Sequence, residues 1–250
     1  MSPPAVYAAR AKRYMHEYGA TDEDLALVCV KNRRHALTNR NSLFQTETSV
    51  EEVLSSRLVA DPLTLLQCCA RADGAAALVI GNENWARKAQ RAPVRILASQ
   101  LTSGTYRGDF RDLTSPEITV RCAAQAYAEA GVRPADLHLA EVHDAFSIAE
   151  LLYYEALGLC KPGEAKHLIR EGATSVGGRV PVNPSGGLIA KGHPPGATGI
   201  AQVVEVVKQL RGDAGPRQVN GASTALTHCT GGGVSGLDHG ACTIHILSRG

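Results

Sequence analysis

Three motifs in the second half of the chain carry side chains that can transfer protons or attack a carbonyl. The first runs from Asn183 to Gly199, where five glycines and three prolines surround one imidazole, that of His193. Glycine lets a ligand come close to the backbone, and proline stiffens the adjoining turns. A rigid loop of this kind suits an acid/base or an oxyanion donor better than it suits a core. The alternative interpretation is a structural turn in which His193 only caps the next helix.

The second motif is His143-Asp144-Ala145-Phe146, which follows an expected strand and precedes an expected helix. Strand ends of α/β sheets are where functional sites collect. The third motif is Cys229 with the glycines at 231–233. Its thiol can shuttle a proton or attack a carbonyl, and the following backbone N–H groups can stabilise an oxyanion. Taken singly, His143 could also be a hydrogen-bonded residue at the edge of the sheet. The Cys229 motif could likewise be a glycine-rich hairpin turn with an inert cysteine.

Together, two histidines, a cysteine and a glycine-rich donor array indicate acyl or carbon–carbon chemistry on a thioester. A serine hydrolase fits less well, because the chain has no Gly-x-Ser-x-Gly elbow.

The elements that must position these motifs alternate between strands and helices, which predicts an α/β layered sheet with helices on its faces. Strands are expected at 74–80, 94–101, 137–143, 218–227 and 241–248. Helices are expected at 3–18, 21–34, from 49, 85–90, 116–131, 146–157 and 196–210. The first 62 residues read as helices and loops without a sheet of their own, which favours a solvated face or cover.

Composition narrows the function classes. A net charge of +2 with three Phe, seven Tyr and one Trp argues against a dedicated nucleic-acid binder. No apolar run is long enough to span a membrane, and no leader peptide is apparent. Seven scattered cysteines without a Cys-x-x-Cys pair predict a reduced, cytoplasmic protein without a zinc site.

The motif set resembles the thiolase family. The resemblance continues back through Ser56 to Ile80 and covers essentially the whole chain. His143, in place of the Asn common in degradative and biosynthetic thiolases, is similar to the sterol-carrier-protein-linked branch and its bacterial relatives. The resemblance implies a thiolase-like layered α-β-α-β-α fold, here incomplete. It divides the chain into a loop domain covering coenzyme A (1–62), the closing part of the N-terminal core (63–110) and a C-terminal thiolase domain (111–250).

Site roles follow from the same resemblance. His193 would activate the nucleophilic cysteine and share an oxyanion hole with His143. Cys229 would be the second acid/base, and the Gly231 N–H would contribute to a second oxyanion hole. The substrate- and coenzyme A-binding loop would comprise Asn183, Ser185, Gly186, Gly187 and Phe146. The family chemistry needs no metal and no covalently bound cofactor, and its substrates are coenzyme A and acyl-CoA thioesters.

One departure from the family pattern matters. The family's nucleophilic cysteine belongs to an N-terminal half, and Met1 aligns after it, inside the loop domain. The remaining cysteines lie in expected helices, an apolar run or a closing strand, without a glycine-rich strand-to-helix elbow: Cys29, Cys68, Cys69, Cys122, Cys160 and Cys242. The chain is therefore expected to be inactive alone, and to associate through the apolar face that the other half would cover.

Three functions remain open. The first is a thiolase-type acyltransferase that cleaves or forms 3-oxoacyl-CoA and whose true start lies upstream. The second is a subunit of a complexed enzyme, completed by another polypeptide or an OB-fold partner, that runs a retro-aldol reaction on a steroid- or acyl-CoA side chain. Such aldolases use tyrosines, and none lies within the three motifs. The third is a non-catalytic remnant. By the family resemblance the chain is expected to form a homo-oligomer.

Overall fold

The computed structural model describes residues 2–89, 91–105, 111–232 and 239–250. The N-terminal segment is built from α1 (Pro3–Tyr18), α2 (Asp22–Ala36), α3 (Val50–Ser55), the antiparallel pair β1 (Leu58–Ala60) and β2 (Leu63–Thr64), and the 3-10 turn η1 (Leu65–Gln67). Capping boxes start α2 at Thr21 and α3 at Ser49, which is where the sequence predicts these helices to begin. α1 ends at Gly19, whose φ of 67° closes the helix in the left-handed conformation.

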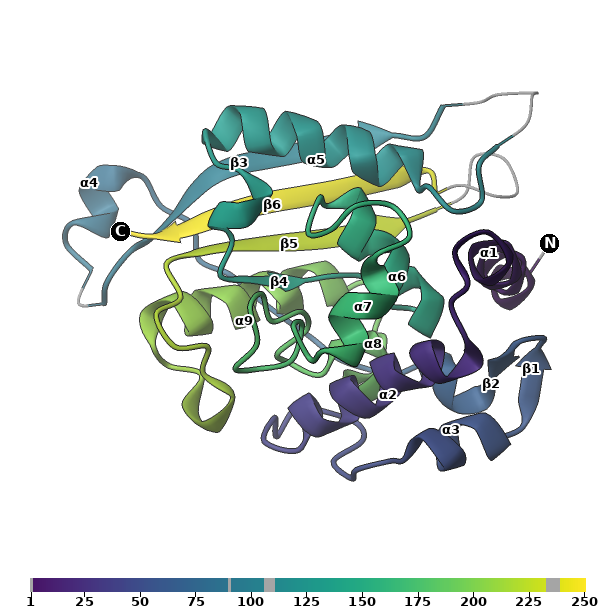
Figure 1. Ribbon diagram of the computed structural model, residues 1–250. Helices are drawn as coiled ribbons and strands as arrows, with labels where there is room; N and C mark the ends of the chain where they lie inside the picture. Colours follow the sequence, from purple (N-terminus) through teal and green to yellow (C-terminus); the bar gives the residue numbers. More distant parts are fainter. Residues whose placement is uncertain (1, 90, 106–110, 233–238) are drawn as a thin grey trace.

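The rest of the chain is organised around one four-stranded sheet in the order β3-β6-β5-β4 (Figure 1). These strands are β3 (Val94–Ser103), β4 (Leu139–Glu141), β5 (Thr224–Gly231) and β6 (Ala241–Arg249). Only the β4–β5 pair is parallel. The α/β class predicted from the sequence is therefore confirmed.

Helices cover both faces of this sheet. α5 (Glu117–Ala130) packs on β3 and β6, and α9 (Thr198–Arg211) packs on β5. Neighbouring residues of a strand point to opposite faces, so Ile246 joins the core that contains α5 while Leu247 joins the small core under α9. The other helices are α4 (Glu83–Ala86), α6 (Ser147–Ala156), α7 (Ala165–Arg170) and α8 (Gly187–Lys191), with 3-10 turns η2 (Pro134–Asp136) and η3 (Gly215–Arg217).

The first 62 residues were expected to form a solvated face or cover, and α2 is a cover rather than a solvated face. This helix lies against α6, α7 and α8 (Figure 1). It buries not only Leu25 and Val28 but also the charged and amide side chains of Lys31 and Asn32. The polar sequence of α2 suggested exposure to solvent. Polar side chains can be buried only when hydrogen-bond partners on other elements satisfy them, and those partners cannot be seen in the local sequence.

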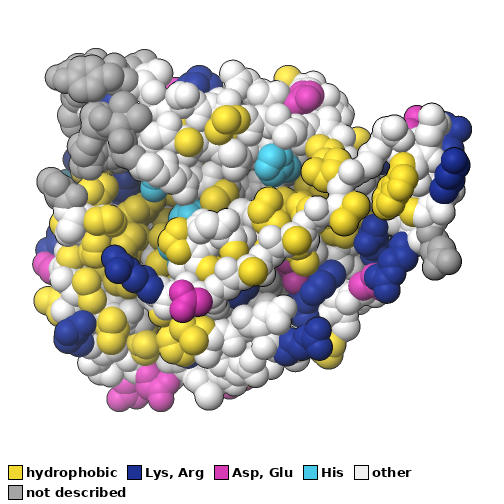
Figure 2. Space-filling view, turned by 180° about the vertical axis from the view of Figure 1, so that it is seen from behind, with side chains coloured by type: hydrophobic (Ala, Val, Ile, Leu, Met, Phe, Trp, Pro, Cys, Tyr) yellow, Lys and Arg dark blue, Asp and Glu magenta, His cyan; other side chains and the backbone are white. Residues whose placement is uncertain are grey.

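The strand expected at 74–80 is a wrong prediction. No described strand runs beside this segment, and Val79 and Ile80 are 84% and 74% exposed. An apolar run becomes a strand only where a neighbour accepts and donates its backbone hydrogen bonds. The helix expected through Trp85 to about residue 90 is present as the four residues of α4, and residue 90 itself lies outside the described residues. Seen from behind, the molecule shows apolar side chains over much of an exposed face (Figure 2).

No helix in the described part of the chain has the length and apolar character needed to span a bilayer.

Candidate active site

Adjacent parallel strands bring two of the predicted site residues together. Glu141 of β4 pairs with Thr227 of β5. His143 and Cys229 each follow that pair by two residues, so the register places them side by side at one edge of the sheet. The imidazole Nδ1 of His143 lies 3.3 Å from the thiol sulfur of Cys229. The strand register thus brings together two residues that the sequence singled out separately.

His193 reaches the same place from the glycine- and proline-rich loop. Its ring stands edge-on to that of His143, with centroids 4.9 Å apart and planes at 88°. Its backbone N–H donates to the carbonyl of Ala70 across 2.8 Å. The structure therefore gathers the three predicted chemical groups, those of His143, His193 and Cys229, into one cluster.

Thr198 fixes which nitrogen of His193 is free. The Thr198 hydroxyl donates to the Pro194 carbonyl at 2.9 Å, so its oxygen is left to accept. The His193 Nδ1 lies 2.8 Å from that oxygen, which assigns the ring proton to Nδ1. The lone pair then resides on Nε2, where a base needs it. Sequence reasoning missed Thr198, although its place five residues after the histidine, at the start of α9, was a usable signal.

Burial sets the protonation states of the cluster. It lowers the pKa of His143 to about 3, with the neighbouring His193 and His239 adding to the shift. Burial also lowers the pKa of His193 and raises that of the Cys229 thiol to about 11. At neutral pH the cluster therefore holds two neutral imidazoles and one protonated thiol. Such a thiol is a proton donor rather than a resident nucleophile.

The predicted substrate loop is fastened internally. Asn183 sits at a φ of 55° and is fully buried; its Oδ1 accepts from the Val142 N–H at 2.8 Å. Ser185 donates to the Glu141 carboxylate at 2.7 Å. Their polar side chains hold the loop in place, and a contact with substrate stays a prediction for them.

The paired glycines of the loop are required by close packing. A Cβ on Gly186 would lie 2.8 Å from the Cβ of Ala36, and one on Gly187 would lie 2.2 Å from an Asp144 oxygen. Gly231 ends β5 opposite Ala241, and Gly233 lies outside the described residues. The oxyanion role of Gly231 stays a prediction.

Phe146 is backed by aromatic residues that the motifs did not reveal. Its ring stacks on Tyr7 of α1 with centroids 4.6 Å apart. The Tyr7 hydroxyl lies 2.7 Å from Nε2 of His239 and 3.2 Å from the hydroxyl of Tyr153. The Tyr153 hydroxyl lies 3.3 Å from that of Thr230, next to Cys229. Only the fold brings α1 to the site, so no local signal in the sequence marks Tyr7.

Of the other six cysteines, Cys68 and Cys69 lie beside the site: Cys68 forms a backbone bridge with Phe146, and the Cys69 backbone N–H donates to the Ala145 carbonyl at 2.9 Å. Cys29, Cys122 and Cys242 are fully buried within α2, α5 and β6. Cys68 and Cys69 follow η1, and Cys160 follows α6. Burial raises the pKa of the Cys69 and Cys160 thiols to about 12.

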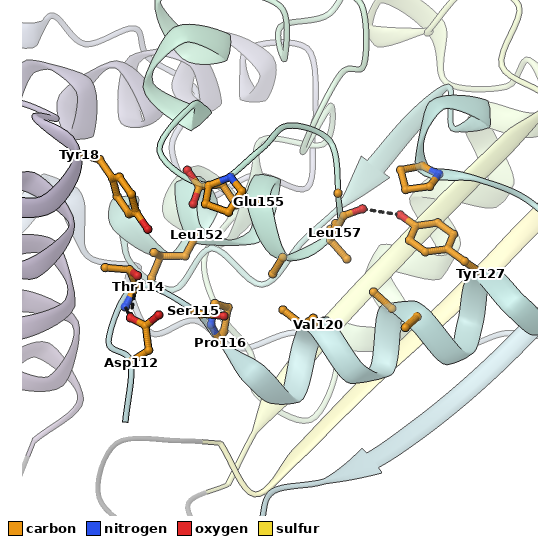
Figure 3. A pocket seen from close by; sticks show the side chains of 16 residues that line it. Tyr18, Asp112, Thr114, Ser115, Pro116, Val120, Tyr127, Leu152, Glu155 and Leu157 are labelled. Carbon is orange, nitrogen blue, oxygen red and sulfur yellow. Dashed lines mark hydrogen bonds between the residues drawn. The ribbon is translucent and has the colours of Figure 1, made fainter. Parts of the chain in front are cut away.

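A hollow of about 510 Å³ lies between α5 and α6, lined by Val120, Tyr127 and Leu152 and bordered by Glu155 (Figure 3). None of the predicted site residues lines it. A second hollow of about 510 Å³ includes Ser185, Lys191 and Thr198 and passes beside the His193 loop.

Comparison with known proteins shows the family of the chain. Residues 99–248 match the family model described as thiolase C-terminal domain-like. The chain is 48% identical over 241 residues to the benzoylsuccinyl-CoA thiolase subunit BbsB of Thauera aromatica, covering 95% of this chain and 63% of that protein. It is 47% identical to an acetyl-CoA acetyltransferase of Methanothermobacter thermautotrophicus, covering 98% and 63%. The chain thus spans less than two thirds of the length of both relatives.

A solved structure titled Ltp2-ChsH2(DUF35) aldolase superposes with a TM-score of 0.83 at 29% identity, covering 99% of this chain and 64% of that one. The chain belongs to the thiolase family, and its residues 99–248 correspond to the family's C-terminal domain.

Proposed function

We propose that the chain supplies the acid–base groups of a thiolase-type acyltransferase, which cleaves 3-oxoacyl-CoA with coenzyme A or condenses two acyl-CoA molecules in reverse. The observation that carries the proposal is the cluster of His143, His193 and Cys229, with the 3.3 Å contact between His143 and Cys229 at its centre. The matches to CoA-thioester enzymes support the substrate class.

Each group has the protonation state that its step requires. In cleavage, Nε2 of His193 takes the thiol proton of the nucleophilic cysteine, and the resulting thiolate adds to the 3-oxo carbon. The bond between C2 and C3 then breaks, and its electron pair moves to C2 to form the enolate of an acyl-CoA. The protonated thiol of Cys229 delivers a proton to C2. Coenzyme A then gives its thiol proton to the Cys229 thiolate, and its sulfur takes the acyl group. The nucleophilic cysteine leaves and recovers its proton from His193, so all groups are reset.

His143 suits the oxyanion side of this scheme. Its Nδ1 faces the Cys229 thiol, and when the S–H donates to Nδ1 the ring proton is on Nε2. A neutral imidazole with a free Nε2–H can donate to a developing enolate oxygen without carrying a charge of its own. Its lowered pKa keeps it neutral during the reaction.

The nucleophilic cysteine is assigned to the part of the relatives that this chain does not match. The proposal keeps the division into a loop domain at 1–62, a core segment at 63–110 and a C-terminal domain at 111–250. On this basis the chain works with a complementary N-terminal half, as a homo-oligomer in the cytoplasm. Its intact mass from the source organism, compared with 26.4 kDa, tests whether that half is covalently joined.

The activity test uses the natural protein, complete with any co-purifying polypeptide. It is incubated with a 3-oxoacyl-CoA and coenzyme A, and the acyl-CoA products are quantified while acylated cysteine peptides are sought by mass spectrometry. We expect a covalent acyl-enzyme, and we expect His193→Ala to abolish it. Cys160→Ser, which lies apart from the cluster, is the matched control. Full acylation of the His193 variant would refute its role as the activating base.

The aldolase match favours a second candidate, a retro-aldol reaction on a steroid- or acyl-CoA side chain with an OB-fold partner protein. The tyrosines absent from the motifs are present in space, since Tyr7 stacks on Phe146 and Tyr153 lies beside Thr230. A retro-aldolase releases an aldehyde or ketone without consuming coenzyme A. A non-catalytic remnant would show neither acyl transfer nor carbonyl release.

A further inference from the structure

Two buried carboxyl groups lie directly behind the histidine cluster, and the proposed steps use neither. Asp144 and Glu150 are both fully buried. The side-chain amide of Asn32, from α2, donates to both of them at 2.8 Å. Lys31, also from α2, lies 2.6 Å from Glu150 and neutralises it. Asp144, in contrast, accepts hydrogen bonds from neutral donors, namely the Asn32 amide and two backbone N–H groups.

Asp144 is bonded to the loop that ends in His193. Its Oδ1 accepts from the backbone N–H of Leu188 at 2.7 Å, at the amino end of α8. Its Oδ2 lies 3.4 Å from the backbone nitrogen of Ile189. α8 is five residues long, and Gly192 then leads into His193. Because Asp144 directly follows His143, one side chain spans the two histidine segments.

A second tether holds the other side of His143. The backbone N–H of Val142 donates to Oδ1 of Asn183 at 2.8 Å, so the same loop is bonded both before and after His143. The contact at Asp144 is tight, because a Cβ on Gly187 would lie 2.2 Å from its Oδ2. A one-residue shift of either segment would break these bonds.

We propose that Asp144 is a positioning residue, whose carboxyl group joins the His143 turn to the start of α8 and so sets the placement of the His143 and His193 imidazoles relative to each other and to Cys229. The inference deepens the proposed function and rests on it for its kinetic consequence. Asp144 touches no reacting atom; it acts through the two histidines.

The test compares Asp144→Asn with Glu205→Gln in the natural protein. In Asp144→Asn, the new amide NH₂ would face at least one of the three N–H donors to Asp144, which come from Asn32, Leu188 and Ile189. At least one of these hydrogen bonds is therefore lost, while the size of the side chain is unchanged. Glu205→Gln also changes a buried carboxyl group. Glu205 lies on α9 and pairs with Arg217 of η3 at 2.8 Å, and its described hydrogen bonds are with Gln209 and Arg217, not with either histidine segment. Two readouts are taken: kcat and KM for thiolysis, and the rate of alkylation of Cys229 by iodoacetamide at fixed pH, followed by peptide mass spectrometry.

For Asp144→Asn we expect kcat to fall by about 100-fold with KM nearly unchanged, since a displacement of about 1 Å costs that much. We also expect the alkylation rate of Cys229 to change at least several-fold, because its contact with His143 loosens. Glu205→Gln should leave both readouts near wild type. Wild-type kinetics and wild-type alkylation of a folded Asp144→Asn protein would overturn the proposal, and so would equal effects of the two substitutions.

The alkylation rate separates this inference from the proposed function, because it needs no turnover. If the wild type lacks thiolase activity but Asp144→Asn still alters Cys229 reactivity, the positioning role stands and the function fails. If Asp144→Asn does not fold, Asn32→Leu removes one donor to Asp144 and keeps the α8 bonds. It should then give a smaller change in both readouts, and no change would overturn the proposal.

Discussion

Thr198 holds His193 in one tautomer, through a 2.8 Å contact between its Oγ1 and Nδ1 of the imidazole. The same hydroxyl donates to the Pro194 carbonyl, which leaves it only an acceptor for the ring. The unprotonated nitrogen of His193 is therefore set by Thr198, a residue that the proposed steps do not use.

Replacing Thr198 by Val should lower kcat for acyl transfer by about 10- to 100-fold, since the substitution removes the hydrogen bond that orients a general base. Thr198→Ser keeps a hydroxyl and should restore most of the rate. Steady-state kinetics of the two variants provide the measurement. Equal rates for the Val and Ser variants would show that the hydroxyl does not orient His193.

Cys229→Ala should permit formation of the acyl-enzyme but stall the carbon–carbon step, because the enolate carbon loses its proton donor. The rate of that step should fall by about 100-fold or more, the range typical of a lost general acid. Single-turnover analysis of acylated peptide and of acyl-CoA product separates the two steps. Loss of acylation in Cys229→Ala would instead make this thiol part of the first step.

Lys31→Met should destabilise the protein by about 3–5 kcal/mol, because it leaves the buried Glu150 carboxylate without its cation. The two side chains are 4% and 0% exposed. Lys12→Met is the matched control, since Lys12 pairs with Asp61 at the surface and should cost only about 0–1 kcal/mol. Urea unfolding of both variants measures the difference, and similar losses would contradict the buried role of Lys31.

Acidification should destabilise the fold through His35. Its Nδ1 lies 2.9 Å from the Asn183 carbonyl, and its Nε2 accepts from the Val176 N–H at 3.0 Å, so the folded ring is neutral. Burial lowers its pKa to about 3, whereas the unfolded chain binds the proton near pH 6.5. Between those values the unfolded state holds one more proton, so stability falls as the pH falls, by about 1.4 kcal/mol per pH unit.

Free energies of unfolding at pH 7 and pH 5 test this. Replacing His35 by Gln should shrink the loss of stability between the two pH values by about 2 kcal/mol, whereas Gln at the exposed His16 should not. An unchanged pH dependence in the His35 variant would assign acid sensitivity to other groups.

The isolated chain should self-associate, because Val79, Ile80 and Leu101 are 84%, 74% and 69% exposed. Sedimentation velocity over a concentration series measures this, and Val79→Lys with Ile80→Glu should reduce it. A monomer at all concentrations with a sharp melting transition would contradict the prediction.

The sequence predicted best what depends on neighbours along the chain. The starts of α2 and α3 and the ends of α1, α5 and α6 were all confirmed within a few residues. The meeting of His143 with Cys229 was predictable because both are strand-end residues. α8 was missed, because a five-residue helix among glycines has no periodicity to detect.

Distant packing was beyond local patterns. The expected strand at 74–80 failed because its formation depends on a partner strand, and Tyr7 and Asn32 reach the site only through the path of α1 and α2. Asn32 also lies in a helix whose polar sequence suggested solvent, and its burial becomes visible only beside Asp144 and Glu150.

The position of β6 has a consequence for the order in which the protein is made. This strand is the last of the described sheet along the chain, yet it lies between β3 and β5 and pairs with both. β3 and β5 are joined only through β6, so the sheet cannot close during synthesis before β6 has left the ribosome. Until then the inner edges of β3 and β5 are unpaired templates for strands of other chains. The nascent chain just short of β6 is therefore the species most exposed to aggregation.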